Sequence, residues 1–287
     1  MKPSELVLNE DGTVYHLHLK AENISDTIIL VGDQNRVQQI SKHFDSIEFE
    51  TAHREFKTHT GIYKNKRITV ISTGIGPGNI DIVLNELDAL VNIDFSTRKL
   101  HEHLKSLDLI RVGTSGSLQK NIPINSFVMS TQALDLNGML HHYQIDEIRN
   151  HEIEEAFIKH TNWDPNKANP IVIDNSKKLE LKFESSVMHK GLTGTSSGFY
   201  GPQGRVLRLP LKHEDLNSKI DSFNHDGVRV TNFEMETSAI YGLAKLLGHN
   251  AISLSAILAN RADGTFSDDP NKVVEDLITY VLDNIGD

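Results

Sequence analysis

The chain contains no cysteine among its 287 residues. Disulfides, thiolate nucleophiles and cysteine-ligated zinc sites are therefore excluded together, and the absence fits a reducing compartment. No apolar run approaches the roughly 18 to 20 residues that a membrane-spanning helix needs, and the first residues lack the apolar segment of a signal peptide. We therefore expect a cytoplasmic protein.

Basic residues are scarce relative to acidic ones. The chain has 29 Lys and Arg against 39 Asp and Glu, which gives a formal net charge of -10. A general binder of nucleic acid or of an anionic membrane surface needs the opposite excess, so neither partner is expected. Any anionic ligand must instead be held by a local cluster of basic groups.

Apolar, β-branched runs alternate with helical patterns along the chain. Such alternation is typical of an α/β protein, and we predict a single layered domain over 1–287 with a central mixed β-sheet flanked by helices. Segments 94–106 and 137–175 break the pattern and are interpreted as surface insertions, the second with a short helix at 152–160. The predicted strands are 27–33, 67–74, 107–116, 127–135 and 251–261, and the other predicted helices are 36–44, 79–91, 235–248 and 271–285.

Three of the predicted strands end in glycine-rich turns, VGDQNR, STGIGPGN and RVGTSGS. None fits G-x-G-x-x-G or G-x-x-x-x-G-K-[ST], so the fingerprints of dinucleotide and P-loop sites are missing. Arg36 and Arg111 nevertheless lie at or beside such turns, and Thr114 supplies a hydroxyl. Ligands of α/β sheets gather outside the carboxyl ends of the strands, so these groups predict an anion site there.

Seven motifs follow one another along the chain: VGDQNRV, AHREF, STGIG, RVGTSG, GFYGPQGR, NFEMET and ILANR. In order and spacing they resemble the nucleoside phosphorylase superfamily, and within it the uridine phosphorylases. The resemblance extends from about Tyr15 to the C-terminal helical pattern. It implies a pentosyltransferase for which inorganic phosphate displaces the base of a nucleoside, most simply uridine, to give ribose 1-phosphate. It implies no organic cofactor and no metal.

The resemblance also implies roles for single residues. The phosphate would be bound by Gly32, Arg36, Arg111 and Thr114, and by Arg54 reaching across from a neighbouring subunit. Guanidinium groups suit this task because they offer forked donors to a dianion.

For the ribose, the resemblance implies Glu236 as acceptor of the vicinal hydroxyls, with Met235 packed on the sugar. Glu234 would line the same region, and its alternative is a solvated place in a first helical turn. His16 would contact the 5′-hydroxyl across a subunit interface, with His18 as an adjacent competitor.

The base would be read by Gln203 and Arg205, beside Phe199 and supported by Arg261. Glutamine offers both a donor and an acceptor to a uracil edge, and arginine can stabilise charge on the leaving base. The implied catalytic residues are thus Arg111, Gln203, Arg205 and Glu236.

Three alternatives stay open. Asp263 keeps a purine phosphorylase possible, a hydrolytic nucleosidase would use water instead of phosphate, and a non-catalytic relative would only bind nucleosides. Because Arg54 and His16 resemble residues that act across an interface, a homodimer with shared sites is the least that the chemistry requires, and the family suggests a hexamer. Gly204, between the two base readers, departs from the pattern expected of bacterial members.

Overall fold

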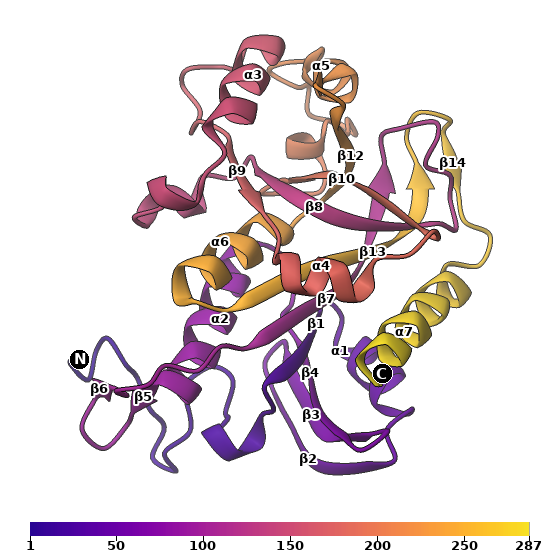
Figure 1. The fold of residues 1–287 in the computed structure, drawn as a ribbon. Coiled ribbons are helices and arrows are strands. Elements are labelled where there is room, and N and C mark those ends of the chain that lie inside the picture. The colour runs from indigo at the N-terminus through magenta and orange to yellow at the C-terminus, as the bar shows by residue number, and fades with distance from the viewer. Residues whose placement is uncertain (287) are drawn as a thin grey trace.

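The computed structural model describes residues 1–286 and is organised around one large mixed sheet (Figure 1). The strands follow the order β11-β12-β10-β8-β13-β7-β1-β4-β3-β2, while β14 pairs with β13 and β9 with β8. The strands are β1 (Thr27–Val31), β2 (Ser46–His53), β3 (Phe56–Tyr63), β4 (Lys66–Ser72), β7 (Asp108–Ser117), β8 (Phe127–Asp135), β9 (Ile171–Asp174), β10 (Met188–Thr195), β11 (Asn224–His225), β12 (Val228–Glu234), β13 (Asn250–Asn260) and β14 (Thr265–Phe266).

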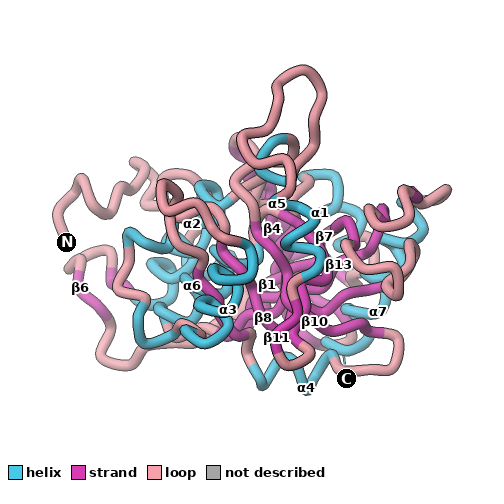
Figure 2. The backbone as a smooth tube through the Cα atoms, turned by 90° about the horizontal axis from the view of Figure 1, so that it is seen from above, coloured by secondary structure: helices cyan, strands magenta, loops and turns pink. Residues whose placement is uncertain are grey.

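Seven α-helices surround the sheet, and their bounds are α1 (Gln34–Ser41), α2 (Pro77–Asn92), α3 (His151–Thr161), α4 (Lys177–Phe183), α5 (Leu216–Ser222), α6 (Thr237–Leu247) and α7 (Pro270–Gly286). Seen from above, α2 and α6 lie on one side of the strands and α7 on the other (Figure 2). Within residues 1–286, every helix is too short or too polar to cross a membrane.

Apolar side chains hold these layers together. One core joins α2 and α6 to the sheet through residues such as Leu84 and Ile240, and a second joins α1 and α7 through residues such as Val37 and Leu277. A third core packs α3 and α5 on the β10–β12 end of the sheet, with Phe157 at its centre. The predicted mixed sheet flanked by helices is therefore confirmed.

The carboxyl ends of the central strands lie at one edge of the sheet. Strands β4, β1, β7 and β13 are parallel neighbours, so the turns that follow them meet at one edge of the sheet. Strand β12 is parallel to β10 and also pairs with the end of β7 at Ser117 and Gly116. This pairing brings the NFEMET motif to the same edge.

The predicted strands and helices match observed elements, but the periodicity missed several strands. Strand β2 is largely exposed and carries charged side chains, so it has no apolar run. Segment 137–175 contains α3 as expected, and also β9, four residues that add to the large sheet beside β8. Segment 94–106 is not wholly irregular, because β6 (Lys99–Leu100) pairs with β5 (Ile93–Asp94) as a small separate sheet.

Candidate active site

A cavity of about 1230 Å³ opens at the edge where the strand ends meet. Its walls come from the turns after β1 and β4, from β7, from the β12–α6 junction and from the end of β13. The outer wall is formed by the 199–205 segment and the β13–β14 hairpin. The large sheet and the turns that follow its strands therefore supply most of the lining, and the 199–205 segment supplies the irregular part.

The predicted phosphate side of the cavity is lined by Gly32, Arg36, Arg111 and Thr114. Arg36 donates from Nη1 to the Val112 carbonyl at 3.3 Å, while its buried Nε has no hydrogen-bond partner within residues 1–286. The Nη1 of Arg111 is likewise buried without a partner. Buried N–H groups normally find an acceptor, so these two donors are available to a ligand oxygen.

Arg111 forms the centre of a buried charge cluster. Its Nη2 lies 2.5 Å from Oε2 of Glu236 and 3.3 Å from Oε2 of Glu234. Burial alone lowers the pKa of Arg111, but the two carboxylates outweigh it and raise that pKa above the usual arginine value, so the guanidinium is charged. Burial raises the pKa of Glu236, which Arg111 opposes and Glu234 reinforces.

The guanidinium of Arg111 folds back over its own strand. A Cβ at position 113 would stand 1.8 Å from Nη1 of Arg111, so only glycine leaves room for it. Gly113 of the RVGTSG motif thus leaves space for the arginine. It lies inside β7, which continues to Ser117, so the expected turn at this glycine is wrong.

Glu234 ends β12 and is only 4% exposed, so the solvated first-turn alternative is wrong. Its carboxylate accepts hydrogen bonds from the backbone N–H groups of Glu236 and Thr237 and from the Thr195 hydroxyl. The first backbone N–H groups of a helix have no acceptor within the helix, and the Glu234 carboxylate supplies one at the start of α6. Glu234 lines the cavity, yet its main contacts fix the helix start.

Glu236 and Met235 lie between β12 and α6 and both line the cavity. Oε1 of Glu236 accepts the backbone N–H of Gly76 at 2.7 Å, while Oε2 accepts from Arg111. Gly76 has φ +95° and precedes Pro77, the first residue of α2. The start of α2 and the start of α6 are thereby joined through one carboxylate at the floor of the cavity.

The predicted base readers lie together in the 199–205 segment, where Gln203 Nε2 also donates to the Glu234 carbonyl at 3.5 Å. Arg205 donates from Nη1 to Oε1 of Gln203 at 2.6 Å, and its guanidinium lies 3.7 Å from the centre of the Phe199 ring. Nη2 of Arg261 donates to the Gln203 carbonyl at 2.7 Å. Burial lowers the pKa of Arg205, and burial together with Arg205 lowers that of Arg261.

Two predicted residues do not reach the cavity of this chain. His16 pairs through Nδ1 with Oε1 of Glu86 at 2.6 Å, and the exposed Arg54 lies over the Tyr15 ring with 5.7 Å between the guanidinium carbon and the ring centre. The His53 ring is stacked on the His18 ring, and its Nδ1 lies within hydrogen-bond distance of the His16 carbonyl. The three histidines therefore form one group on the surface. Neither His16 nor Arg54 lines the cavity.

The residues at the end of β13 and after it bear on the choice between a pyrimidine and a purine phosphorylase. Arg261 lines the cavity, whereas Asp263 is exposed and lies outside its lining. The Asn260 side chain is buried in contacts with the backbone of Gln119 and Ile122. The sequence interpretation missed Phe233, Leu258, Ala259 and Phe266, which line the cavity as apolar groups.

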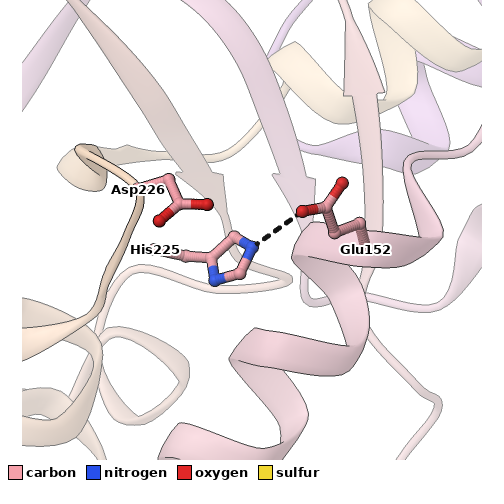
Figure 3. A group of neighbouring side chains, drawn as sticks. All are labelled: Glu152, His225 and Asp226. Carbon is pink, nitrogen blue, oxygen red and sulfur yellow. Dashed lines mark hydrogen bonds and ion pairs between the residues drawn. The ribbon is translucent and has the colours of Figure 1, made fainter.

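A group of potential metal ligands lies elsewhere. Glu152, His225 and Asp226 point toward one another, with all ligand atoms within 4.8 Å, and His225 Nε2 is 3.2 Å from Oε1 of Glu152 (Figure 3). Glu152 comes from α3, His225 from β11 and Asp226 from the turn between β11 and β12, and none lines the cavity.

Comparison with known proteins agrees with this geometry. A family model described as the phosphorylase superfamily matches residues 26–282. The chain is 30% identical to a uridine phosphorylase of Thermococcus kodakarensis over 266 residues, which cover 90% of this chain and 81% of the relative. It is 27% identical to a purine nucleoside phosphorylase of the DeoD type from Streptococcus thermophilus, with 94% and 98% covered.

A solved structure gives the same picture. The crystal structure of a Trypanosoma brucei nucleoside phosphorylase, described as showing uridine phosphorylase activity, superposes with a TM-score of 0.88 at 27% identity. The match covers 97% of this chain and 98% of the other.

Proposed function

The chain belongs to the phosphorylase superfamily, and on this premise we propose that it is a pentosyltransferase that cleaves a pyrimidine nucleoside, uridine, with inorganic phosphate. The products are uracil and ribose 1-phosphate. The observation that supports this most is that one cavity is lined by two features, namely Arg36 and Arg111, each with an N–H group that has no partner within residues 1–286, and the Gln203–Arg205 pair.

In this reaction a phosphate oxygen forms a bond to the anomeric carbon while the bond from that carbon to the base nitrogen breaks. The bonding electrons leave with the base, so the ribose becomes cationic and the base anionic in the transition state. Arg36, Arg111 and the backbone N–H of Gly32 hold the phosphate, with the Thr114 hydroxyl as a further donor. Prearranged donors of this kind act without reorganisation when charge develops.

Glu236 serves the ribose. Its carboxylate faces the cavity and can accept both vicinal hydroxyls, while its negative charge favours a cationic sugar. Arg111 neutralises it in the resting enzyme, so the arriving phosphate competes with Glu236 for the same guanidinium. Met235 provides an apolar contact for the sugar, and Glu234 supports the site by fixing the start of α6.

Uracil is recognised by Gln203 and Arg205. Gln203 is 2% exposed, and its amide already donates to the Glu234 carbonyl at 3.5 Å and accepts from Arg205. A bound base must therefore replace these contacts with hydrogen bonds of its own, which favours a base whose edge matches the amide. The Arg205 charge stabilises the leaving anion, and Arg261 and Phe199 frame the same end of the cavity. The exposed position of Asp263 disfavours the purine alternative, because this acid lies outside the lining of the cavity.

No cofactor is required, since phosphate is itself a substrate, and we place the reaction in the cytoplasm as part of pyrimidine salvage. The active unit is at least a homodimer and can extend to a hexamer. His16 and Arg54 share one surface beside, but outside, the cavity of their own chain, so they are available to the site of a partner.

The deciding test is base release from uridine, thymidine, inosine and adenosine, each with and without inorganic phosphate, followed by chromatography. We expect uracil together with ribose 1-phosphate, and only when phosphate is present. Equal uracil release without phosphate would identify a hydrolytic nucleosidase instead. Release of a purine base would retain the phosphate site and refute the base readers, and no release from any nucleoside would indicate a binding protein.

Shared sites can be tested by mixing two inactive variants. Arg111→Ala removes a group of the chain's own cavity, and Arg54→Ala removes the group offered to the partner. Random pairing makes half of the dimers mixed, each with one intact site, so the mixture should regain about a quarter of the wild-type activity. No recovery after subunit exchange has been verified would mean that Arg54 acts within its own chain. An Arg54→Ala variant that is active by itself would mean that Arg54 does not contribute to the site.

A further inference from the structure

The 199–205 segment, which carries the proposed base readers, forms a hydrogen bond with Asn217, a residue that does not line the substrate cavity. The Gln203 carbonyl accepts two side-chain hydrogen bonds, one from Arg261 Nη2 at 2.7 Å and one from Asn217 Nδ2 at 3.0 Å. Arg261 belongs to the cavity wall, whereas Asn217 comes from α5 and lines a second cavity of about 610 Å³ together with Gly204 and Arg205. The segment therefore has contacts on both of its faces.

Gly204 and Asn217 fit each other closely. Gly204 has φ +69°, a conformation that side chains with a Cβ rarely adopt. A Cβ at this position would also stand 1.6 Å from Nδ2 and 2.3 Å from Cγ of Asn217. The glycine between the two base readers is thus required by the asparagine that packs on it, which gives this departure from the family pattern a physical reason.

Helix α5, which carries Asn217, is anchored to the rest of the protein by its own contacts. Ile220 is 1% exposed within the third core. Gln119 donates from Nε2 to the Asp221 carbonyl at 3.1 Å, and Nε2 of His160 lies 3.0 Å from the Lys219 carbonyl. These contacts tie α5 to the residues after β7 and to α3.

We propose that Asn217 is a positioning residue for base recognition. By donating to the Gln203 carbonyl it sets the plane of the Gln203–Gly204 peptide, and this plane aims the Gln203 amide and the Arg205 guanidinium into the substrate cavity. The inference rests on the proposed uridine phosphorolysis, because Gln203 and Arg205 matter to it only as readers of the base.

The first test is steady-state kinetics of Asn217→Ala and Asn217→Asp with uridine and phosphate varied separately. Loss of one hydrogen bond should lower kcat/KM for uridine roughly threefold to tenfold, mainly through a higher KM for uridine. The KM for phosphate should stay within about twofold, because the arginine cluster on the sheet is untouched. Asp keeps the shape of Asn but cannot donate at neutral pH, so it should be no better than Ala.

The matched control is Ser218→Ala, which removes an exposed hydroxyl from the same helix, bonded only to the Asp215 carbonyl. It should match the wild type in both KM values. A second test exploits the close contact: Gly204→Ala should reduce uridine turnover more than Asn217→Ala, and adding Asn217→Gly should restore part of it. The part that is not restored reflects the strained φ of residue 204.

Several results would overturn the inference while the proposed function stands. These are an Asn217→Ala enzyme with wild-type KM for uridine, an Asn217→Asp enzyme with full activity, or a KM for phosphate that rises in the same proportion as that for uridine. A wild-type protein that releases no uracil from uridine would refute the proposed function and this inference together, so the two failures are distinguishable.

Discussion

The two ends of the cavity are built by different means. At the phosphate and ribose end, the polar groups stand on strand ends and helix starts, and Arg111 and Glu236 are both buried and paired. At the base end, Gln203 and Arg205 lie in a segment without long secondary structure, beside Phe199, which is 51% exposed. Under the proposed function, the fixed part of the site serves phosphorolysis itself, while the irregular part sets which base is accepted.

The two ends of the cavity should also differ in how substitutions affect them. The arginine cluster depends on a glycine in a strand, on two carboxylates and on two helix starts, so one substitution disturbs several elements. The base end depends on a few hydrogen bonds around the Gln203 carbonyl. Substitutions should therefore affect both stability and turnover at the first end, and chiefly nucleoside selectivity at the second.

The largest effect is expected for Arg111→Ala. This change removes a phosphate donor and leaves Glu234 and Glu236 buried without a counter-charge. We expect kcat/KM for phosphate to fall by roughly 10³-fold and the melting temperature to drop by roughly 10 °C. Arg111→Lys keeps the charge and should lose less in both measurements. An alanine variant that melts like the wild type would contradict the buried cluster.

The next effect separates the two glutamates of the EME motif. Glu236→Gln loses the charge that faces the ribose, and kcat/KM for uridine should fall roughly 10²-fold, as for a hydrogen bond that involves a charged group. Glu234→Gln weakens the acceptor for the first backbone N–H groups of α6, so its main effect should be a lower melting temperature, with turnover less affected. Steady-state kinetics and thermal unfolding of both variants provide the check. If Glu234→Gln lost more turnover and Glu236→Gln more thermal stability, the roles assigned to the two glutamates would have to be exchanged.

A smaller effect is expected at the base end. Arg205→Ala should lower kcat/KM for uridine by roughly 30-fold and leave the KM for phosphate nearly unchanged, because Arg205 contacts Gln203 and Phe199 and not the arginine cluster. The control is Arg208→Ala, which removes an exposed arginine three residues further along. An unchanged rate for Arg205→Ala would count against uracil recognition by this segment.

The difference between the two ends also explains what the sequence could predict. Part of the anion site follows from general rules, because Arg36 comes directly after the turn that follows β1, and such turns share one edge of a parallel sheet. Arg111 instead lies inside β7, and its guanidinium packs against Gly113 of the same strand. The buried place of Glu234 did not follow, since two acidic residues before an apolar helix look the same whether they are solvated or folded into its start. Only the tertiary pairing of β12 with β10 and β7 distinguishes the two cases.

The base end was predictable only through the resemblance. No periodicity marks 198–215. Asn217 packs against Gly204, which is 13 positions away, and donates to the Gln203 carbonyl, and such contacts leave no local signal in the sequence. Strands β2 and β9 were missed for related reasons, since one is exposed and the other is four residues long. Short or exposed elements obtain their structure from their neighbours in the sheet rather than from their own sequence.

The smallest effect, ideally none, is expected outside both ends of the cavity. Glu152, His225 and Asp226 could bind a divalent cation, but the Glu152 side chain is 77% exposed and the group belongs to α3, to β11 and to the turn after β11. Chelator treatment and His225→Ala should each leave uridine phosphorolysis within about twofold of the untreated wild type, as surface changes away from a site usually do. If a chelator abolished turnover, and a divalent cation restored it only when His225 was present, a metal-free reaction would be the wrong proposal. In that case the exposed group, rather than either end of the cavity, would control the rate.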